Sequence, residues 1–170
     1  MKAPNIILIG MPGSGKSTVG RIVSKMSGMK FIDIDSYIIK KEGIKPRDIV
    51  NEKGLEEFLK IQEEAVVDLK VINHIIATGG SVVYSEISMN HLKSNGSIIY
   101  LKTDFESINK RTGKNRRLAR EKGKTLYDVY CERTILYERY SDFTIECTKK
   151  SPQEAAEEIK NYINNTRGRK

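Results

Sequence analysis

One short segment, residues 10–18, constrains the fold of this chain more than any other. It reads GMPGSGKST and matches the pattern G-x-x-x-x-G-K-[ST], which holds nucleotide phosphates between a strand and a helix. The aliphatic run at 6–9 precedes the motif, and a helical pattern follows it from Lys16. Because strand, loop and helix occur in the required order, the sequence predicts a phosphate-binding loop within an α/β domain.

The residues of this motif have separate roles in phosphate binding. Its glycines let successive backbone N–H groups point at one oxyanion, and the dipole of the following helix adds positive potential. We expect the Lys16 ammonium to reach the β- and γ-phosphates and the Ser17 hydroxyl to ligate Mg²⁺. The nucleotide-binding residues predicted from the motif are Gly13, Ser14, Gly15, Lys16, Ser17 and Thr18.

Short β-branched runs alternate with longer helical patterns along the rest of the chain, as in a parallel sheet covered by crossover helices. The expected strands are residues 5–9, 30–33, 74–78, 97–101 and 143–146. The expected helices are residues 16–26, 35–41, 46–51, 55–72, 87–93, 105–111, 125–141 and 152–164. A chain of 170 residues fits one domain, so we predict a single α/β domain over residues 1–170.

Two aspartates follow the second expected strand. In the segment 31–35, Asp33 and Asp35 alternate with apolar residues, so both carboxylates leave one face of the strand at its carboxyl end, beside the phosphate loop. In phosphoryl transfer, one carboxylate can hold the water shell of Mg²⁺ and another can orient or deprotonate the acceptor hydroxyl. Asp33 and Asp35 fit these two roles. A helix N-cap is the alternative for Asp35, because a helical pattern begins at Ser36.

The positive charge of the chain is concentrated in one segment. The chain has 30 basic and 22 acidic residues, and residues 110–124 alone hold eight basic side chains against one glutamate. Within it, residues 112–123 have two glycines and few apolar side chains, which predicts a mobile lid over the nucleotide. Arginines on such a lid can neutralise the phosphates, and Arg116 and Arg117 are the first candidates. The alternative is a solvated charged loop.

The sequence disfavours several other classes of nucleotide-binding protein. A GTPase needs an N-K-x-D element, and the Asn-Lys pair at 109–110 has no aspartate in place. Large ATPases carry acidic residues at the end of a long strand, whereas the strand expected at 74–78 leads into two glycines. A nucleic-acid-binding module is a further alternative, but the basic segment 110–124 has no interleaved aromatic residue for base stacking. A small kinase remains.

The chain also carries no pattern typical of a membrane or secreted protein. Its longest apolar run is residues 6–9, whereas a helix that spans a bilayer needs about 20 apolar residues. The first residues do not resemble a signal peptide. We therefore expect a cytoplasmic monomer that acts on a small molecule.

Five elements of the sequence together resemble the shikimate kinase family over essentially the whole chain. They are the phosphate loop at 10–18, the Asp33-x-Asp35 pair, Gly79-Gly80, Arg116 in the basic segment, and Arg133-x-x-Leu136-Tyr137. The resemblance implies a three-layer α/β/α fold of the nucleoside-monophosphate-kinase type with a five-stranded parallel sheet. It also implies phosphorylation of the 3-hydroxyl of shikimate by ATP and Mg²⁺ in aromatic amino-acid biosynthesis.

On the nucleotide side, the resemblance implies a role for residues outside the phosphate loop as well. Asp33 would share Mg²⁺ with Ser17, and Arg116 would clamp the phosphates. Arg111 and Pro152 would flank the adenine. By this resemblance, the catalytic residues would be Lys16, Asp35 and Arg116.

On the acceptor side, the resemblance implies that the helical region at about 35–62 binds the substrate. Gly80 would offer its backbone N–H, and Arg133 would hold the substrate carboxylate. The expected substrate-binding residues are Asp35, Phe58, Lys60, Gly79, Gly80 and Arg133.

The chain departs from the family pattern beside this carboxylate site. The family has Phe-Arg-x-x-Glu where this chain, starting at Phe58, reads FLKIQ, so that Leu59 replaces the arginine and Gln62 the glutamate that would steady it. Ser81 stands in place of a third glycine. A charged hydrogen bond contributes about 1.5–3 kcal/mol. We therefore expect the chain to bind a substrate carboxylate roughly 10- to 150-fold more weakly, unless Lys60 compensates. A sibling kinase for another small polyol or hydroxy acid is the alternative.

Overall fold

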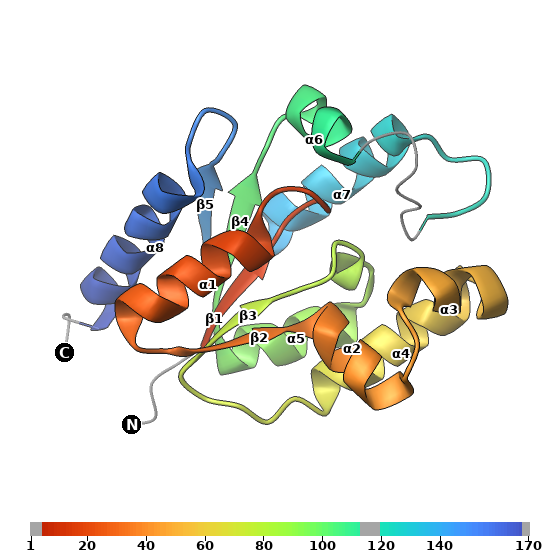
Figure 1. Cartoon of the computed structure of the whole chain (residues 1–170), viewed down its shortest axis with the longest axis horizontal. Helices are drawn as coiled ribbons and strands as arrows, with labels where there is room; N and C mark the ends of the chain where they lie inside the picture. The colour runs from red at the N-terminus through yellow and green to blue at the C-terminus, as the bar shows by residue number, and fades with distance from the viewer. Residues whose placement is uncertain (1–4, 113–119, 168–170) are drawn as a thin grey trace.

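The molecule is built on a five-stranded sheet in which every pairing is parallel (Figure 1). The computed structural model describes residues 5–112 and 120–167. The strands are β1 (Asn5–Ile9), β2 (Lys30–Asp33), β3 (His74–Ala77), β4 (Gly96–Lys102) and β5 (Phe143–Glu146). They lie side by side in the order β2-β3-β1-β4-β5. The predicted strands and the predicted fold class are confirmed.

Helices cover both faces of the sheet and make the three layers (Figure 1). On one face lie α1 (Lys16–Ser27) and α8 (Pro152–Arg167). On the other face lie α4 (Leu55–Val67), α5 (Glu86–Asn95) and α7 (Leu126–Tyr140). Within the described part of the chain, no helix is both long and apolar enough to cross a membrane.

The remaining short elements follow strands β2, β3 and β4 along the chain. The helices α2 (Ile34–Glu42) and α3 (Pro46–Lys53) come after β2, and α6 (Phe105–Thr112) comes after β4. A 3-10 turn, η1 (Val82–Tyr84), which the sequence did not predict, follows β3. These elements therefore gather at the carboxyl edge of the sheet, where parallel α/β proteins bind ligands.

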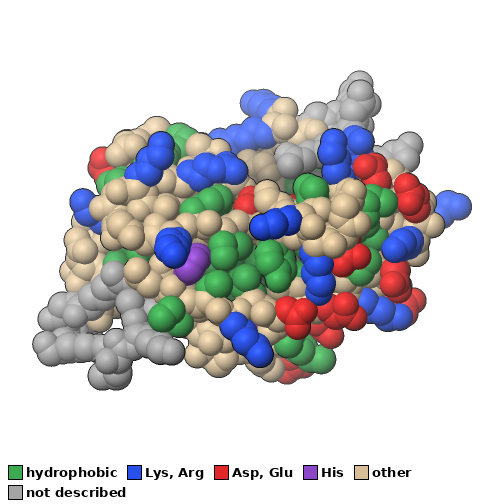
Figure 2. Space-filling model, turned by 60° about the horizontal axis from the view of Figure 1, so that its bottom comes forward, with side chains coloured by type: hydrophobic (Ala, Val, Ile, Leu, Met, Phe, Trp, Pro, Cys, Tyr) green, Lys and Arg blue, Asp and Glu red, His purple; other side chains and the backbone are tan. Residues whose placement is uncertain are grey.

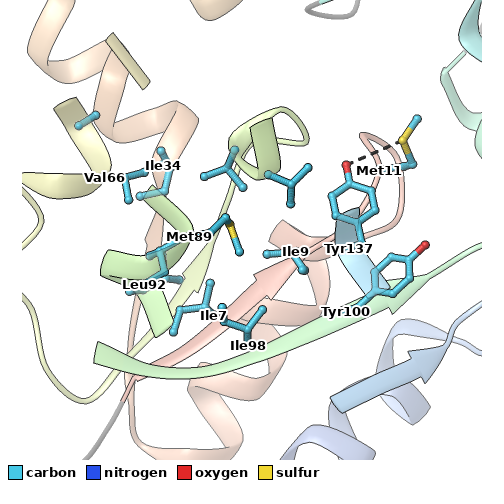
Figure 3. Close-up of a cluster of buried hydrophobic side chains, with 14 of the residues drawn as sticks. Ile7, Ile9, Met11, Ile34, Val66, Met89, Leu92, Ile98, Tyr100 and Tyr137 are labelled. Carbon is cyan, nitrogen blue, oxygen red and sulfur yellow. Dashed lines mark hydrogen bonds between the residues drawn. The ribbon is translucent and has the colours of Figure 1, made fainter. Parts of the chain in front are cut away.

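The central strand β1 is buried on both of its faces. Ile7 and Ile9 belong to the core beneath α4, α5 and α7, and Ile6 and Leu8 belong to the core beneath α1 and α8. Figure 3 shows Ile7 and Ile9 packed among side chains of the first core. A parallel strand covered on both sides reads as a continuous apolar run, which is why residues 6–9 show no alternation.

One helix ends earlier than its pattern predicts. The expected helix at 55–72 stops at Val67, and the chain turns before it enters β3. Asn73, at the end of this turn, has φ 58°, a left-handed conformation that asparagine tolerates better than most residues. Its carbonyl accepts a hydrogen bond from Lys30 N at 3.2 Å and so ties the turn to β2. This contact is between segments far apart in the sequence, so helical periodicity does not reveal it.

Asn5 joins three segments at the start of β1. Its side chain is 1% exposed, and its Nδ2 donates to the carbonyls of Val71, at 2.8 Å, and Asn95, at 3.2 Å. Its Oδ1 accepts from the backbone N–H of His74 at 3.0 Å. One amide therefore satisfies backbone groups at the entry to β3 and at the end of α5.

We predict that Asn5→Ala lowers the free energy of unfolding by at least about 2 kcal/mol, because it leaves buried backbone groups without a partner. Urea denaturation followed by circular dichroism measures this change. Asn165→Ala, at an exposed position near the end of α8, is the matched control and should change stability little. Equal stability of the two variants would contradict this role of Asn5.

Candidate active site

The loop between β1 and α1 has the conformation that the motif predicts. Gly13 and Gly15 have φ of 85° and 93°, in the left-handed region where any other side chain would be strained, and α1 begins at Lys16. Lys16 is 7% exposed, and its Nζ donates to the carbonyls of Gly10, at 2.7 Å, and Met11, at 2.8 Å. The ammonium is thus held against the loop at the N-terminus of a helix, where it can meet an anion.

A cavity of about 230 Å³ lies over this loop. Its lining residues are Pro12, Gly13, Gly15, Lys16, Ser17, Thr18, Asp33, Asp35, Thr78, Gly79 and Gly80. Ser14 is the one predicted nucleotide residue of the loop outside this lining; it is buried, and its N–H closes a turn onto the Met11 carbonyl at 3.0 Å. The geometry therefore brings the loop and both aspartates to one cavity.

Asp33 and Ser17 both line this cavity, and their side-chain oxygens are in contact. Ser17 Oγ donates to Asp33 Oδ2 at 2.5 Å, and Asp33 Oδ1 accepts from Ser36 N at 3.1 Å. Asp33 is thus the N-cap of α2, and the cap role weighed for Asp35 is wrong. Asp35 lies instead in the first turn of that helix.

This pair of oxygen ligands fits Mg²⁺. Hydroxyl and carboxylate oxygens are the donors that Mg²⁺ prefers, and the ion usually keeps several waters and binds substrate phosphates besides one or two protein groups. Among the described residues, no group of three or more His, Cys, Asp or Glu side chains could form an all-protein cage. The donor set is that of a metal carried with a nucleotide.

A second cavity, of about 380 Å³, lies next to the first. Its lining residues are Pro12, Asp35, Ile39, Lys45, Pro46, Arg47, Val50, Phe58, Gln62, Gly79, Gly80, Ser81 and Arg133. Four residues line both cavities: Pro12, Asp35, Gly79 and Gly80. Asp35 is the one carboxylate among these four, so it stands where a phosphate over the loop and a hydroxyl in the second cavity would meet.

The two glycines after β3 pack closely against groups that line the site. A Cβ on Gly79 would lie 2.4 Å from Gln62 Nε2 and 2.9 Å from Asp35 Oδ1. A Cβ on Gly80 would lie 2.5 Å from Cδ of Pro12. Side chains at these positions would collide with groups that line the site. The backbone at the junction of the cavities can therefore approach a ligand closely.

Helix α7 contributes two buried side chains, one turn apart, to this junction. Tyr137 Oη donates to the Gly80 carbonyl at 2.6 Å, and Figure 3 shows the ring beside Met11. Burial raises the pKa of Tyr137 far above its usual value, so the hydroxyl stays protonated and keeps donating. Arg133 is 1% exposed, and its Nε donates to Tyr84 Oη at 3.1 Å. The guanidinium also lies over the Tyr84 ring, 5.0 Å from its centroid.

The predicted residues for adenine and for the lid lie outside the lining of the two cavities or outside the described residues. Arg111 reaches across the phosphate loop, where its Nη1 donates to the Gly13 carbonyl at 3.1 Å. Pro152 begins α8 at the carboxyl edge of the sheet. The predicted lid arginines, Arg116 and Arg117, lie outside the described residues.

The structure does not bring Lys60 to the second cavity. Phe58 and Gln62, four residues apart on α4, share the face that lines the cavity, whereas Lys60 lies on the opposite side of the helix. Its side chain is 63% exposed, and its Nζ lies 3.4 Å from Glu56 Oε1. Leu59 packs against the hydrophobic core. The compensation expected from Lys60 therefore has no geometric support.

Comparison with known proteins places the chain among its relatives. The family model described as shikimate kinase matches residues 12–164. The chain belongs to the shikimate kinase family. A shikimate kinase of Clostridium botulinum is 38% identical over 168 residues, which cover 94% of this chain and 97% of the relative. One from Sulfurihydrogenibium is 34% identical over 160 residues, which cover 91% and 95%.

Solved structures agree with this assignment. A shikimate kinase of Acinetobacter baumannii in complex with shikimate matches with a TM-score of 0.87 and 28% identity, over 96% of this chain and 94% of that chain. Thymidylate kinase from Candida albicans, 16% identical, matches over 99% of this chain and 94% of that chain with a TM-score of 0.67, which shows the common fold. The nucleoside-monophosphate-kinase type of fold is confirmed. As a member of this family, the chain is an ATP-dependent phosphotransferase that uses Mg²⁺.

Sequence reasoning missed several lining residues of the second cavity. Lys45, which caps α3, and Arg47, in the first turn of α3, carry positive charge to it. Their only local signal is the position of Pro46 between them, which marks the start of a helix and not a site. Gln62 and Ser81 stood out only as departures from the family pattern, yet Ser81 Oγ donates to Gln62 Oε1 at 2.9 Å. That contact joins residues far apart in the sequence.

We predict that Lys16→Met reduces kcat at least about 100-fold, because the variant cannot stabilise the charge of the transferring phosphoryl group. A coupled assay of ADP release measures the change, and circular dichroism checks the fold. Lys25→Met, on the exposed side of the same helix, is the control and should keep normal turnover. Near-normal turnover of Lys16→Met would overturn the assignment of the phosphate loop.

We predict that Asp35→Asn reduces kcat about 100-fold or more while the melting temperature changes little, because the amide cannot accept a proton and Asp33 supplies the helix cap. Steady-state kinetics and differential scanning calorimetry separate the two effects. The exposed Asp68→Asn serves as the control. A lower melting temperature with full activity per folded molecule would make Asp35 a structural residue.

Proposed function

We propose that this chain transfers the γ-phosphoryl group of ATP to the 3-hydroxyl of shikimate and so forms shikimate 3-phosphate in aromatic amino-acid biosynthesis. The observation that carries the proposal is that two adjacent cavities share Asp35, one over the phosphate loop and one that contains the buried Arg133. The structural neighbour from Acinetobacter baumannii, in complex with shikimate, supports this choice of acceptor.

On the donor side, Lys16 would contact the β- and γ-phosphates, and Mg²⁺ would be held by Ser17 and, through its waters, by Asp33. Magnesium supplies neutralisation of the phosphate charge as the transfer proceeds. Arg111, already bonded to the phosphate loop, would flank the adenine together with Pro152. Arg116, in the expected lid at about 112–123 and outside the described residues, would neutralise phosphate charge.

At the junction of the cavities, Asp35 would accept the proton of the acceptor hydroxyl. The hydroxyl oxygen forms a bond to the γ-phosphorus as the bond to the bridging oxygen breaks, and ADP leaves. The Gly80 N–H, on the segment that Tyr137 anchors, would donate to the acceptor. These groups position the reactants and stabilise charge, which is most of what an enzyme contributes to phosphoryl transfer.

The charge of the second cavity favours an acidic acceptor. Its lining contains three cations, Lys45, Arg47 and Arg133, against one carboxylate, Asp35. Arg133 is buried, so its attraction for a carboxylate is screened little by solvent. This excess supports shikimate or a similar hydroxy acid over a neutral polyol, even though Leu59 stands where the family has a second arginine.

We further propose a single kinase domain over residues 1–170 with its acceptor-binding region at about 35–62, acting in the cytoplasm as a monomer. One sheet with a core on each face supports the single domain. Figure 2 shows a face of the molecule on which Lys and Arg side chains are scattered among Asp and Glu side chains. That face offers no broad basic surface to a nucleic acid.

We predict that Arg133→Lys raises the KM for shikimate about tenfold or more and leaves the KM for ATP unchanged, because lysine cannot bind a carboxylate with two parallel hydrogen bonds. The methyl ester of shikimate, which lacks the charge, should bind the variant and the unchanged enzyme about equally. Arg139→Lys, exposed on the same helix, is the control. If the variant still prefers the acid over the ester as strongly as the unchanged enzyme does, Arg133 does not bind the carboxylate.

A further inference from the structure

Gln62 is a buried polar residue whose hydrogen bonding is incomplete. It lies on α4, is 2% exposed and lines the second cavity. Its Oε1 accepts a hydrogen bond from Ser81 Oγ at 2.9 Å. Its Nε2 has no hydrogen-bond partner among residues 5–112 and 120–167. Native proteins seldom keep a buried donor unsatisfied. This amide nitrogen is therefore a candidate to donate a hydrogen bond to a ligand.

The position of Nε2 indicates what that ligand is. A Cβ built on Gly79 would lie within 3 Å of both Gln62 Nε2 and Asp35 Oδ1. The amide nitrogen therefore lies next to the Gly79 backbone, on the same side as the carboxylate that both cavities share. A molecule whose reacting hydroxyl lay at Asp35 would bring a neighbouring oxygen close to this donor.

Ser81 holds the oxygen end of the Gln62 amide. Its hydroxyl is 3% exposed and occupies Oε1, which leaves the two protons of Nε2 directed elsewhere. With glycine at this position, as in the family pattern, the amide would lose its anchor. The two departures from that pattern thus form one hydrogen-bonded unit.

We propose that Gln62 binds the acceptor directly, with Nε2 donating a hydrogen bond to an acceptor oxygen beside the reacting hydroxyl, and that Ser81 is the residue that positions it. The proposal rests on the proposed function of the same site. A glutamate at position 62 would have no arginine at position 59 to pair with and would repel an acidic acceptor. The neutral amide avoids this repulsion and needs no arginine partner.

The test compares wild type, Gln62→Met, Ser81→Ala and the double variant by shikimate KM, kcat and calorimetric Kd. We expect Gln62→Met to raise KM and Kd for shikimate roughly 3- to 10-fold, the effect of one neutral hydrogen bond, with the KM for ATP unchanged. Ser81→Ala should shift the same constants by less. The double variant should equal Gln62→Met, because Ser81 acts only through the amide. Lys60→Met, on the opposite side of α4, is the matched control.

A second arm exchanges the amide for the family's charged pair. Gln62→Glu should raise the shikimate KM more than Gln62→Met does, because it adds a negative charge. Leu59→Arg in the same chain should then restore binding. This rescue would show that a glutamate at position 62 needs an arginine at position 59, whereas the amide does not.

Several results would overturn the proposal. They are an unchanged Kd in Gln62→Met, additive effects of the two single variants, or the same loss of affinity in Gln62→Glu and Gln62→Met. If Gln62→Met does not fold, Ser81→Ala and Gln62→Glu carry the decision. Absence of shikimate turnover by wild type would instead refute the proposed function, and the variants would then be compared on the hydroxy acid that wild type does phosphorylate.

Discussion

The parallel pairing of β1 with both β3 and β4 is the constraint on which the site depends. It places the carboxyl ends of these strands at one edge of the sheet, so the phosphate loop after β1 lies beside the glycines after β3. A hydrogen bond from the buried Tyr137 hydroxyl to the Gly80 carbonyl helps to fix the junction. Strand order brings the segments together, and this bond holds the backbone where a substrate would contact it.

The sequence predicts well those parts of the site whose causes are local. The phosphate loop is specified by its own glycines and by the strand and helix that flank it, and the structure agrees with it in detail. The division of roles between Asp33 and Asp35 was harder, because both alternate correctly along the strand. Asp33 becomes the cap because α2 begins at Ile34, two residues before the helical pattern that starts at Ser36.

The parts that could not be predicted depend on contacts between distant segments. Lys45 reaches the second cavity because the turn between α2 and α3 folds over it, and nothing in its neighbourhood of the sequence marks that approach. Lys60 was expected there on account of its long side chain, but helical geometry directs it to solvent and to Glu56. In the sequence, Gln62 and Ser81 are two separate departures from the family pattern. The fold brings their side chains within hydrogen-bond distance.

The contacts of Lys16 within its own loop also have a consequence for nucleotide binding. Two carbonyl oxygens of its own loop already occupy the ammonium, as phosphate oxygens would. Entry of ATP is then an exchange of partners and not the capture of a bare charge, so the gain from the new contacts is reduced by the loss of the old ones. Because the loop supplies these partners itself, it avoids the cost of burying an unsatisfied cation.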